Sequence, residues 1–514
     1  MKKFPQFLTI LLCCLLLIGV MAACSKSSSK TSSKVEMPPG AVMGPNGKPI
    51  KEEIIIGIQS DPVSLDPHFG TENASRRHTN MIFERLVFFN ASTGKVEPAI
   101  AQSWDINGKE FTFHLRKDIK FHNGKQLTAA DVKYSLDRMK TMPRAATYVV
   151  NVDKVEIVND YTVKVTLKSP SPVFLNNLSI MIAAIIPEGS GDTIAKNPIG
   201  CGPYKFVEWK QDDFIVYERF NDFFGGAKPS PRIRFRTIPD NAARLLALEA
   251  GDIDLCYGVH LADYTMLENR SDIILYKTST TNLEYMAFET TKPPFNNVHA
   301  RRAVAHAINK DAYIKGIFRG EYLNLHSILL PGDPAYRKVD YAEYNPAMAK
   351  EELAKAGSPN GFSFTVASTA ARSNYIEPIQ YDLAQVGIKM TFDIVSNVPS
   401  YAAGAYSGAI ITSTSMPELD GGVLSEFLHS KGGSNQSRYS NPRVDKLFDA
   451  ANVEMDPTKR AAMLGEISEI IAAEVPIHPM HALVYIDGAN SHVKGVEVHS
   501  SSICYYYNIY YEYD

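Results

Sequence analysis

The chain has 514 residues, of which 45% are hydrophobic and 21% are charged, and its formal net charge is −3. A chain of this length is too long for a single hydrophobic core, so it should divide into two or three lobes. The near-neutral charge argues against a nucleic-acid-binding protein, which needs a concentrated basic face. The Ser/Lys run after Cys24 is an exception, but it is too short to be more than a linker.

The N-terminus has the pattern of a secretory signal. Two lysines precede an apolar stretch, residues 7–20, that is too short for a comfortable membrane span. Small residues then lead directly to Cys24, and this arrangement resembles a bacterial lipobox with methionine in place of the usual leucine. We therefore expect a signal peptide over residues 1–23, lipidation of Cys24 and a lipidated tether over residues 24–50. The alternative is an ordinary secreted protein with a chance cysteine. No later apolar stretch is long enough to span a membrane, so we expect the lipid to be the only membrane attachment.

Three further cysteines remain after Cys24, at Cys201, Cys256 and Cys504. An odd number allows at most one disulfide among them and leaves one free thiol. The sequence leaves open whether any of them pair.

The first elements after the tether alternate between strands, turns and helices. Residues 54–58 form a continuous apolar run typical of a buried strand, and turn-forming clusters follow between residues 60 and 67. Residues 80–88 indicate a helix that runs into a strand. In the segment EPAIAQSW, residues 97–104, we expect Trp104 to anchor the core of a small subdomain rather than to contact a ligand.

Residues 111–138, FTFHLRKDIKFHNGKQLTAADVKYSLDR, are the most informative stretch. Apolar and polar side chains alternate over its first five residues, which predicts a strand. Asn123 and Gly124 form a turn dipeptide. Thr128 is placed to cap a helix, with Asp131 at the third helical position, where a carboxylate suits the helix dipole.

The next elements continue the alternation. Residues 152–167 predict a hairpin, residues 214–218 and 233–237 predict strands, and residues 240–251 predict a helix that Asp240 caps and Gly251 ends.

The last third of the chain reads as helices followed by strands. A capping residue followed by proline predicts the start of three helices, at Asn345, Asn441 and Asp456. Residues 376–386 predict an amphipathic helix and residues 388–395 the strand after it. Repetition of helix and strand is typical of an α/β lobe.

Several of these segments, in this order, resemble the extracytoplasmic solute-binding proteins of ABC importers, in the peptide- and nickel-binding family (solute-binding protein family 5). The segment at residues 111–138 carries the family pattern F-T-F-x-L-R…F-x-x-G…A-x-D-V-x-x-S. NPIGCGPY at residues 197–204 resembles P-x-G-T-G-P-Y, with Cys201 in place of threonine, and residues 285–308 resemble Y-x-x-F-N-T…P-F-x-D-x-R-V-R-x-A. The resemblance covers about residues 53–490.

The resemblance implies an α/β fold with two lobes, of the periplasmic-binding-protein type (cluster C), with an extra small subdomain and a hinge between the lobes. It implies a division of the chain into lobe I over residues 51–78, 198–284 and 479–514, the small subdomain over residues 79–197, and lobe II over residues 285–478.

Motifs of enzymes are absent from the sequence, which has no GxSxG, no HExxH and no Walker A pattern. We therefore expect no enzymatic activity, no cofactor and no metal site. His478 and His481 have a spacing that suits a metal ion, but they lack a nearby cysteine or carboxylate in sequence, so we interpret them as strand histidines.

Residues 401–420, YAAGAYSGAIITSTSMPELD, are the expected ligand-facing stretch of lobe II, with a short strand over residues 409–412 that leads into a polar loop containing proline. In peptide-binding members of the family, a tryptophan lines the pocket here and an aspartate soon after it pairs with the α-ammonium of the peptide. This chain departs from that pattern, with Ser413 near the tryptophan position and Met416 near the aspartate position. An arginine that is often found upstream is also missing, since only Ala402 and Ala403 are nearby. The usual anchors for ammonium and carboxylate groups therefore do not carry over.

Substitutes for these anchors remain open at the sequence level. Asp420 or Glu418 could replace the missing aspartate, or both could lie on a solvated loop. The expected ligand contacts in lobe II are Tyr401, Thr412, Ser413, Thr414, Ser415, Met416 and Asp420. From the first lobe and its subdomain we expect Glu72, Asn73 and Tyr148, placed by approximate alignment with the family.

The function that the resemblance implies is capture of a peptide-like solute by closure of the lobes, followed by delivery to the permease and ATPase subunits of an ABC importer. We expect a monomer outside the plasma membrane, on the cell surface or in the periplasm. A buried unpaired ammonium is costly, so a pocket without the aspartate should disfavour short free peptides. Longer or blocked peptides, a sugar-like solute and a metal chelate remain alternatives, as does a sensory lipoprotein with the same fold.

Overall fold

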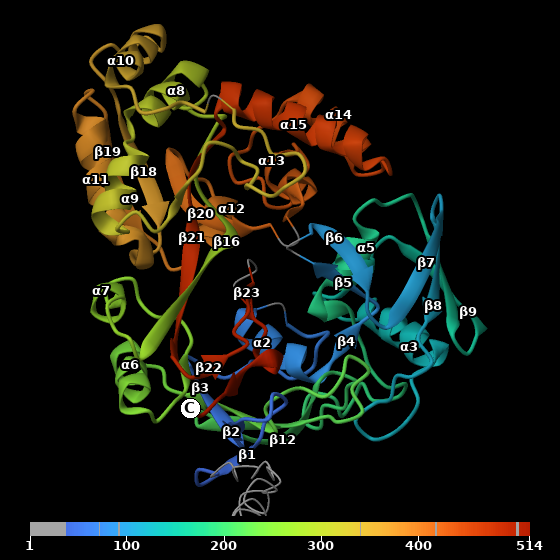
Figure 1. Cartoon of the computed structure of the whole chain (residues 1–514). Coiled ribbons are helices and arrows are strands. Elements are labelled where there is room, and N and C mark those ends of the chain that lie inside the picture. The colour runs from blue at the N-terminus through green and yellow to red at the C-terminus, as the bar shows by residue number, and fades with distance from the viewer. Residues whose placement is uncertain (1–36, 71, 91–92, 340, 417–418, 500–502) are drawn as a thin grey trace, which may run out of the picture.

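The computed structural model describes residues 37–70, 72–90, 93–339, 341–416, 419–499 and 503–514. Figure 1 shows three bodies, with lobe II above, lobe I below and the small subdomain to the right. In the part of the chain that the structure describes, no helix is both long and apolar enough to cross a membrane.

One large mixed sheet runs through both lobes. Its strand order is β12-β13-β14-β3-β15-β21-β16-β20-β18-β19, with β17 paired to β21. The two longest strands, β16 (Ile273–Phe288) and β21 (Ile477–Asn490), pair antiparallel from Ile273↔Asn490 to Ala287↔Ile477. They connect the two lobes, and their register breaks between Ser279 and Leu283.

Lobe I is built on β3 (Glu53–Ile58), which lies between β14 (Arg232–Thr237) and β15 (Leu255–Cys256) in parallel pairs. Of its four isoleucines, those at positions 54, 56 and 58 are fully buried, as the apolar run predicts, and Ile55 is half-buried. The other elements of this lobe are β12 (Tyr204–Lys210), β13 (Phe214–Arg219), α2 (Asn73–Ile82), α6 (Asn241–Ala250) and α7 (Tyr264–Leu267). Asp240 caps α6 through the backbone N–H of Ala243, and Gly251 ends the helix with a φ of 78°.

The small subdomain has its own four-stranded sheet and core. The strands, in sheet order, are β7 (Ala101–Asn107), β8 (Glu110–Leu115), β10 (Thr162–Leu167) and β9 (Val152–Asn159). The helices are α3 (Ala129–Met139), α4 (Ala146–Val149) and α5 (Phe174–Ser179), and short strands are β4 (Glu84–Arg85), β5 (Val87–Asn90), β6 (Lys95–Pro98) and β11 (Ala184–Ile185). Trp104 is half-buried against this core.

Lobe II continues the large sheet with β20 (Ala409–Ser415), β18 (Ser363–Ser368) and β19 (Lys389–Ile394). Its helices are α8 (Val298–Ala307), α9 (Lys310–Ile317), α10 (Pro346–Lys355), α11 (Ser373–Ala384), α12 (Val398–Ala403), α13 (Ser425–Leu428), α14 (Pro442–Ala451) and α15 (Pro457–Glu474). The side chains of Asn345, Asn441 and Asp456 all accept hydrogen bonds as N-caps, as the sequence predicts.

The C-terminal segment returns to lobe I through β22 (Val493–Lys494), β23 (Val498–His499), β24 (Ile503–Cys504) and β25 (Tyr510–Tyr511). Ser230 Oγ donates a hydrogen bond of 2.8 Å to the carbonyl of Ile509, which ties this segment to the lobe I core. β24 also contacts α2.

Two elements differ from the sequence-based expectation. The helix expected to start near residue 80 begins at Asn73. The earlier start was not visible in the sequence, because the first two turns bury polar side chains such as Arg77, His78 and Thr79, which carry no apolar periodicity. The strand expected over residues 409–412 extends to Ser415, so the Ser/Thr run lies in β20 and not in a loop.

Buried sulfur and imidazole groups lie in separate cores. Cys201 packs in the small subdomain and Cys256 in lobe I, and both are free thiols. His478 and His481 lie on β21 with their side chains buried, and the described residues contain no group of three or more potential metal ligands.

Candidate functional site

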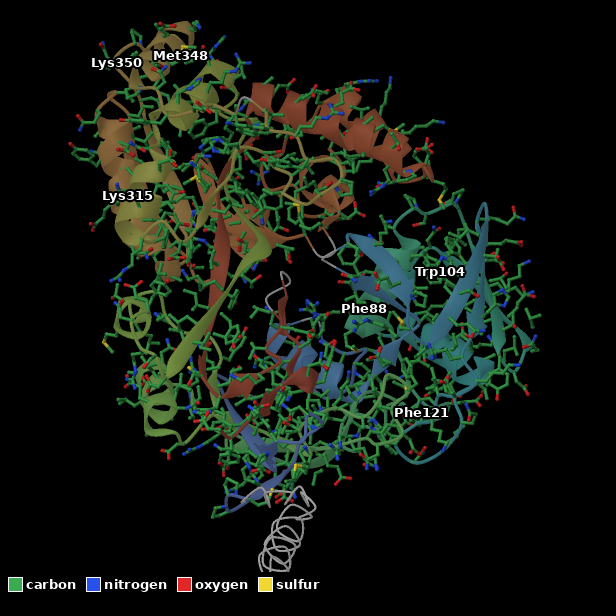
Figure 2. All side chains as sticks on the ribbon, in the orientation of Figure 1. Phe88, Trp104, Phe121, Lys315, Met348 and Lys350 are labelled. Carbon is green, nitrogen blue, oxygen red and sulfur yellow. The ribbon has the colours of Figure 1, made fainter. Side chains whose placement is uncertain are left out.

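The sequence-predicted site residues lie on three parts of the molecule. Glu72 and Asn73 stand at the start of α2 in lobe I, and Tyr148 is on α4 of the small subdomain. The others lie on lobe II, on α12, β20 and the turn that follows β20. Figure 2 labels Phe88 on β5, on the side of the small subdomain that lies toward the crossing strands β16 and β21.

The lobe I candidates belong to a tightly bonded turn. Ser75 Oγ donates a hydrogen bond to Glu72 Oε1 and accepts bonds from the backbone N–H groups of Val63 and Ser64, at 3.1 and 3.3 Å. These bonds tie the loop after β3 to the first turn of α2. Asn73 is half-buried at the first helical position.

Tyr148 has its contacts in the small subdomain, whereas the turn with Glu72 and Asn73 belongs to lobe I. Its ring is half-buried against the core of the small subdomain, and its backbone carbonyl accepts a hydrogen bond of 3.2 Å from Asn177 Nδ2. The shared contact of Tyr148, Glu72 and Asn73 with a solute stays a prediction.

Burial alternates along the polar end of β20. Thr412 is 7% exposed, Ser413 and Ser415 are exposed, and Thr414 is half-buried. Met416 is fully buried in the lobe II core, and its backbone N–H donates to the carbonyl of Thr281 at 2.8 Å. A side chain enclosed in the core offers no surface to a solute, so Met416 supports the strand end rather than presenting an anchor.

Ser413 belongs to a charged network that sequence reasoning missed. Arg372 Nη2 donates to Ser413 Oγ at 3.2 Å and to Glu284 Oε2 at 3.1 Å, while its Nε donates to Glu284 Oε1. Tyr375 donates to the same carboxylate at 2.5 Å. Glu284 is 3% exposed, so Arg372 already neutralises a buried charge. The only sequence signal was Arg372 itself, which lies in a stretch with no capping or periodic feature that linked it to β20.

Asp420 is also committed to partners inside lobe II. Its Oδ1 accepts hydrogen bonds from Arg460 Nη2 at 2.7 Å and from the N–H of Gly422 at 2.8 Å. The side chains of Asp420 and Arg460 are 13% and 14% exposed. Asp420 is therefore an ion-paired cap and not an unpaired carboxylate. Glu418, the other substitute considered, lies outside the described residues.

The last lobe II candidate, Tyr401, is on α12. Its ring is half-buried, with its centroid 5.8 Å from that of Tyr406. Tyr406 donates a hydrogen bond of 2.6 Å to the carbonyl of Gln436. This aromatic pair borders the lobe II core.

Lobe I and the small subdomain offer cationic and aromatic groups that the sequence reasoning did not single out. Arg77 lies one helical turn after Asn73, with its guanidinium 3.8 Å from the ring centroid of Tyr257. Arg85 lies on β4, with its guanidinium 4.9 Å from the ring centroid of Phe88. The doublet Arg76-Arg77 was a visible signal in a near-neutral chain, but the later expected start of the helix left both residues in a loop.

The chain matches the sequence model of "Bacterial extracellular solute-binding proteins, family 5 Middle" over residues 95–435. Among curated proteins it is similar to heme-binding protein A of Haemophilus influenzae, with 29% identity over 93% of this chain and 94% of that protein. It is also similar to the glutathione-binding protein GsiB of Pectobacterium atrosepticum, with 30% identity over 83% of this chain and 87% of that protein.

Solved structures with the same fold cover most of the chain. HbpA2 from Haemophilus parasuis has a TM-score of 0.82 and 25% identity, over 90% of this chain and 100% of that one. The substrate-binding protein CtaP from Listeria monocytogenes has a TM-score of 0.82 and 25% identity, over 90% of this chain and 99% of that one. Both lobes of this chain are therefore included in the similarity.

Proposed function

Because the chain belongs to family 5 of the bacterial extracellular solute-binding proteins, we propose that it captures a peptide-like solute by closing its two lobes and delivers it to the permease and ATPase of an ABC importer. The observation that carries this proposal is the family match over residues 95–435, which includes the small subdomain and much of both lobes. The two strands β16 and β21 are suited to a hinge, because they are the long strands that join the lobes.

Attachment to the membrane is proposed from the sequence alone. Residues 1–36 lie outside the described residues. The signal-like segment over residues 1–23 and the cysteine that follows it support export and lipidation at Cys24. The tether expected over residues 24–50 is too long, because β1 (Ala41–Met43) pairs with β2 (Pro49–Lys51) and Ile50 is buried in the folded protein. On this proposal the protein works as a monomer outside the plasma membrane, held by its lipid alone.

The proposed class of solute depends on whether Met416 and Asp420 in lobe II offer a free carboxylate to an α-ammonium. Met416 is buried and Asp420 is paired with Arg460, so neither residue supplies a free carboxylate for an α-ammonium. A peptide-like solute should therefore be recognised without an ammonium anchor of that kind, as a longer or N-terminally blocked peptide would be. GsiB of Pectobacterium atrosepticum is named for binding glutathione, which supports a peptide-like solute in general and not the absence of an ammonium.

A non-peptide solute is the second candidate. AgaA, whose structure is described in complex with agropinic acid, has a TM-score of 0.73 and 25% identity to this chain. Heme-binding protein A of Haemophilus influenzae also carries the name of a non-peptide ligand. On either candidate we propose binding without covalent chemistry.

Native mass spectrometry of the chain from residue 25 onward, followed by denaturation and identification of the released species, tests the proposal. We expect a monomer that releases a series of peptide masses. A single non-peptide mass would replace the peptide assignment by the second candidate, and a protein that releases nothing and binds no peptide in a thermal-shift screen would contradict solute capture.

Lipidation has a separate test. Metabolic labelling with a radioactive fatty acid should mark the full chain and partition it into detergent, whereas Cys24→Ala should remain unlabelled. Equal labelling of both would contradict the anchor at Cys24.

A further inference from the structure

An ion pair joins the two lobes beside the crossing strands. Lys277 Nζ, on β16, lies 2.9 Å from both carboxylate oxygens of Glu321, which precedes β17 (Leu323–Asn324) in lobe II. The side chains of Lys277 and Glu321 are 35% and 21% exposed. Among the ion pairs of the described residues, this one alone links the lobe I part of β16 to lobe II.

Each partner is fixed to its own lobe. Lys277 lies on the lobe I side of the register break in β16, and its ammonium lies 4.2 Å from the ring centroid of Tyr264 on α7. Glu321 lies two residues before Leu323, which pairs with Ala482 on the lobe II side of the break. A rotation at the break therefore changes the distance between the ammonium and the carboxylate.

The ion pair lies on the face of β16 that is turned toward α6 and α7. Ile273 and Leu275 pack with these two helices in one core cluster, whereas Tyr276 packs with α2 and with Met181 of the small subdomain in another. Successive side chains of a strand point to opposite faces, so Lys277 shares the face of Leu275. Figure 1 shows α6 and α7 on one side of the crossing strands and α2 with the small subdomain on the other.

A second contact between the lobes involves the loop between β15 and α7. Val259 in this loop packs with the cluster of α6 and α7, and its N–H donates a hydrogen bond of 2.7 Å to the carbonyl of Ile486 on β21. Leu261, two residues later, is half-buried against the core of lobe II. The lobes therefore touch on the side of the hinge that faces away from α2.

Closure of the lobes should separate these contacts. The expected solute contacts include Asn73 on α2, Tyr148 in the small subdomain and Thr414 on lobe II, so closure on a solute brings lobe II toward the α2 side. A hinge rotation that closes one side opens the opposite side, and Glu321 then moves away from Lys277. The ion pair is thus an interaction of the open state that the closed state loses.

We propose that Lys277 and Glu321 form a latch behind the hinge, which favours the open state until a solute is captured. This inference rests on the proposed function, because it presupposes closure of the lobes, and it adds a control of the open–closed equilibrium. A partly exposed ion pair changes such an equilibrium by about twofold to fivefold. The latch lowers the affinity for the solute by the same factor, since a solute that binds the closed state must offset the pair.

Single-molecule energy transfer measures the open–closed equilibrium. The chain from residue 25 carries dyes at Lys154→Cys in the small subdomain and Lys315→Cys on lobe II, together with Cys504→Ser, which leaves only buried native thiols. Bound solute is removed by unfolding and refolding. We expect Glu321→Gln to raise the ratio of closed to open molecules about twofold to fivefold. Lys277→Met should do the same, and the double variant should add nothing further, because both changes remove one interaction.

The salt dependence of this ratio gives an independent readout. Salt screens exposed charges, so raising NaCl from about 0.05 to about 0.5 M should shift the wild type toward the closed state and leave Glu321→Gln unchanged. Glu110→Gln is the matched control. Its partner Lys164 lies 2.9 Å away, and the two side chains are 38% and 33% exposed, but both belong to the small subdomain. This control should keep the wild-type ratio and its salt dependence.

The outcomes distinguish the latch from the proposed function, because the solute-free measurement does not depend on which solute is captured. A wild-type ratio in both Glu321→Gln and Lys277→Met, or a lower closed fraction in them, overturns the latch. Capture by closure still stands if a tryptic casein digest raises the energy-transfer efficiency of the wild type. A digest that binds without changing that efficiency overturns closure, and the latch with it.

Discussion

At the scale of single residues, Glu284 and Arg372 form a buried ion pair in lobe II. Glu284 is 3% exposed and accepts hydrogen bonds from Arg372 and Tyr375. Removal of one partner from a buried ion pair leaves the other charge uncompensated, whereas replacement of both by apolar groups is often neutral.

We therefore expect Arg372→Met to lower the free energy of unfolding by about 3–5 kcal/mol in urea titrations. The double variant Arg372→Met with Glu284→Leu should recover most of that loss. Arg443→Gln breaks an exposed pair and should cost no more than about 1 kcal/mol. A double variant as unstable as Arg372→Met alone would show that the network stabilises by more than charge compensation.

Asp487 predicts a pH dependence of stability. Burial raises its pKa from 3.8 to about 6, so the folded protein takes up this proton before the unfolded chain does. The contribution of the Asp487 carboxyl to the free energy of unfolding is therefore complete below about pH 4 and is lost as the pH rises through 6. Buried histidines act in the opposite sense, since burial lowers the pKa of His481 to about 3 and that of His122 to about 4, and their contribution is lost as the pH falls.

The difference in unfolding free energy between Asp487→Asn and wild type isolates the carboxyl group. We expect the free energy of unfolding of the variant, relative to that of the wild type, to increase by about 1–3 kcal/mol from pH 4 to pH 7. The amide oxygen can still accept the hydrogen bond from Gly258, so the contact is kept. A difference that is constant over this range would contradict the raised pKa.

Site residues could be predicted from the sequence only where their partners are local. The departure at Met416 was visible, but its complete burial depends on the whole core of lobe II. Asp420 pairs with Arg460 across 40 residues, and Arg372 pairs with Glu284 across 88. No periodicity or capping pattern encodes contacts of that separation, so the pairing of Glu284 and of Asp420 had to come from the structure.

The start of α3 illustrates the element scale. Thr128 and Asp131 form a capping box, with the Thr128 N–H donating to Asp131 Oδ2 at 2.9 Å. Asp131 also accepts from the N–H of Glu188 and from Lys125, at 2.9 and 2.8 Å, and it is fully buried.

We expect Thr128→Ala to lower stability by about 1 kcal/mol, the usual cost of a lost N-cap. Asp131→Ala should cost more, because it also leaves the N–H of Glu188 without its acceptor in a half-buried position. Thermal unfolding of both variants gives the comparison. Equal losses would show that the cap alone accounts for the role of Asp131.

Elements with strong local signals were predicted well. Helices α10, α14 and α15 begin where an asparagine or aspartate precedes proline, since capping is a local interaction. Helix α2 was misjudged because its buried face is polar, and β20 because serine and threonine at its end were read as a loop. In both elements, packing against the rest of the lobe outweighs the local pattern.

At the scale of the whole molecule, the resemblance to the family predicted the two-lobed α/β fold, which the similarity to HbpA2 from Haemophilus parasuis confirms. The class of solute could not be predicted in the same way, because relatives with this fold are named for binding heme and glutathione. The fold provides two lobes and a connection, whereas the solute is selected by individual side chains on facing surfaces.

The crossing strands provide a place for lobe movement. Between Ser279 and Leu283 the pairing of β16 with β21 is interrupted, with lobe I pairs on one side of the break and lobe II pairs on the other. Rotation about residues 280–282 would therefore disturb few ladder hydrogen bonds. A solute that contacts both lobes stabilises the closed state by its differential affinity for that state.

Dyes at Lys154→Cys in the small subdomain and Lys315→Cys on α9 of lobe II should report this closure. Both lysines are exposed, and the described native thiols, Cys201 and Cys256, are buried. We expect the energy-transfer efficiency to rise when a tryptic casein digest is added to the labelled protein, after bound solute has been removed by unfolding and refolding. A digest that is retained without any change in efficiency would contradict capture by closure, because binding would then be complete in the conformation seen in Figure 1.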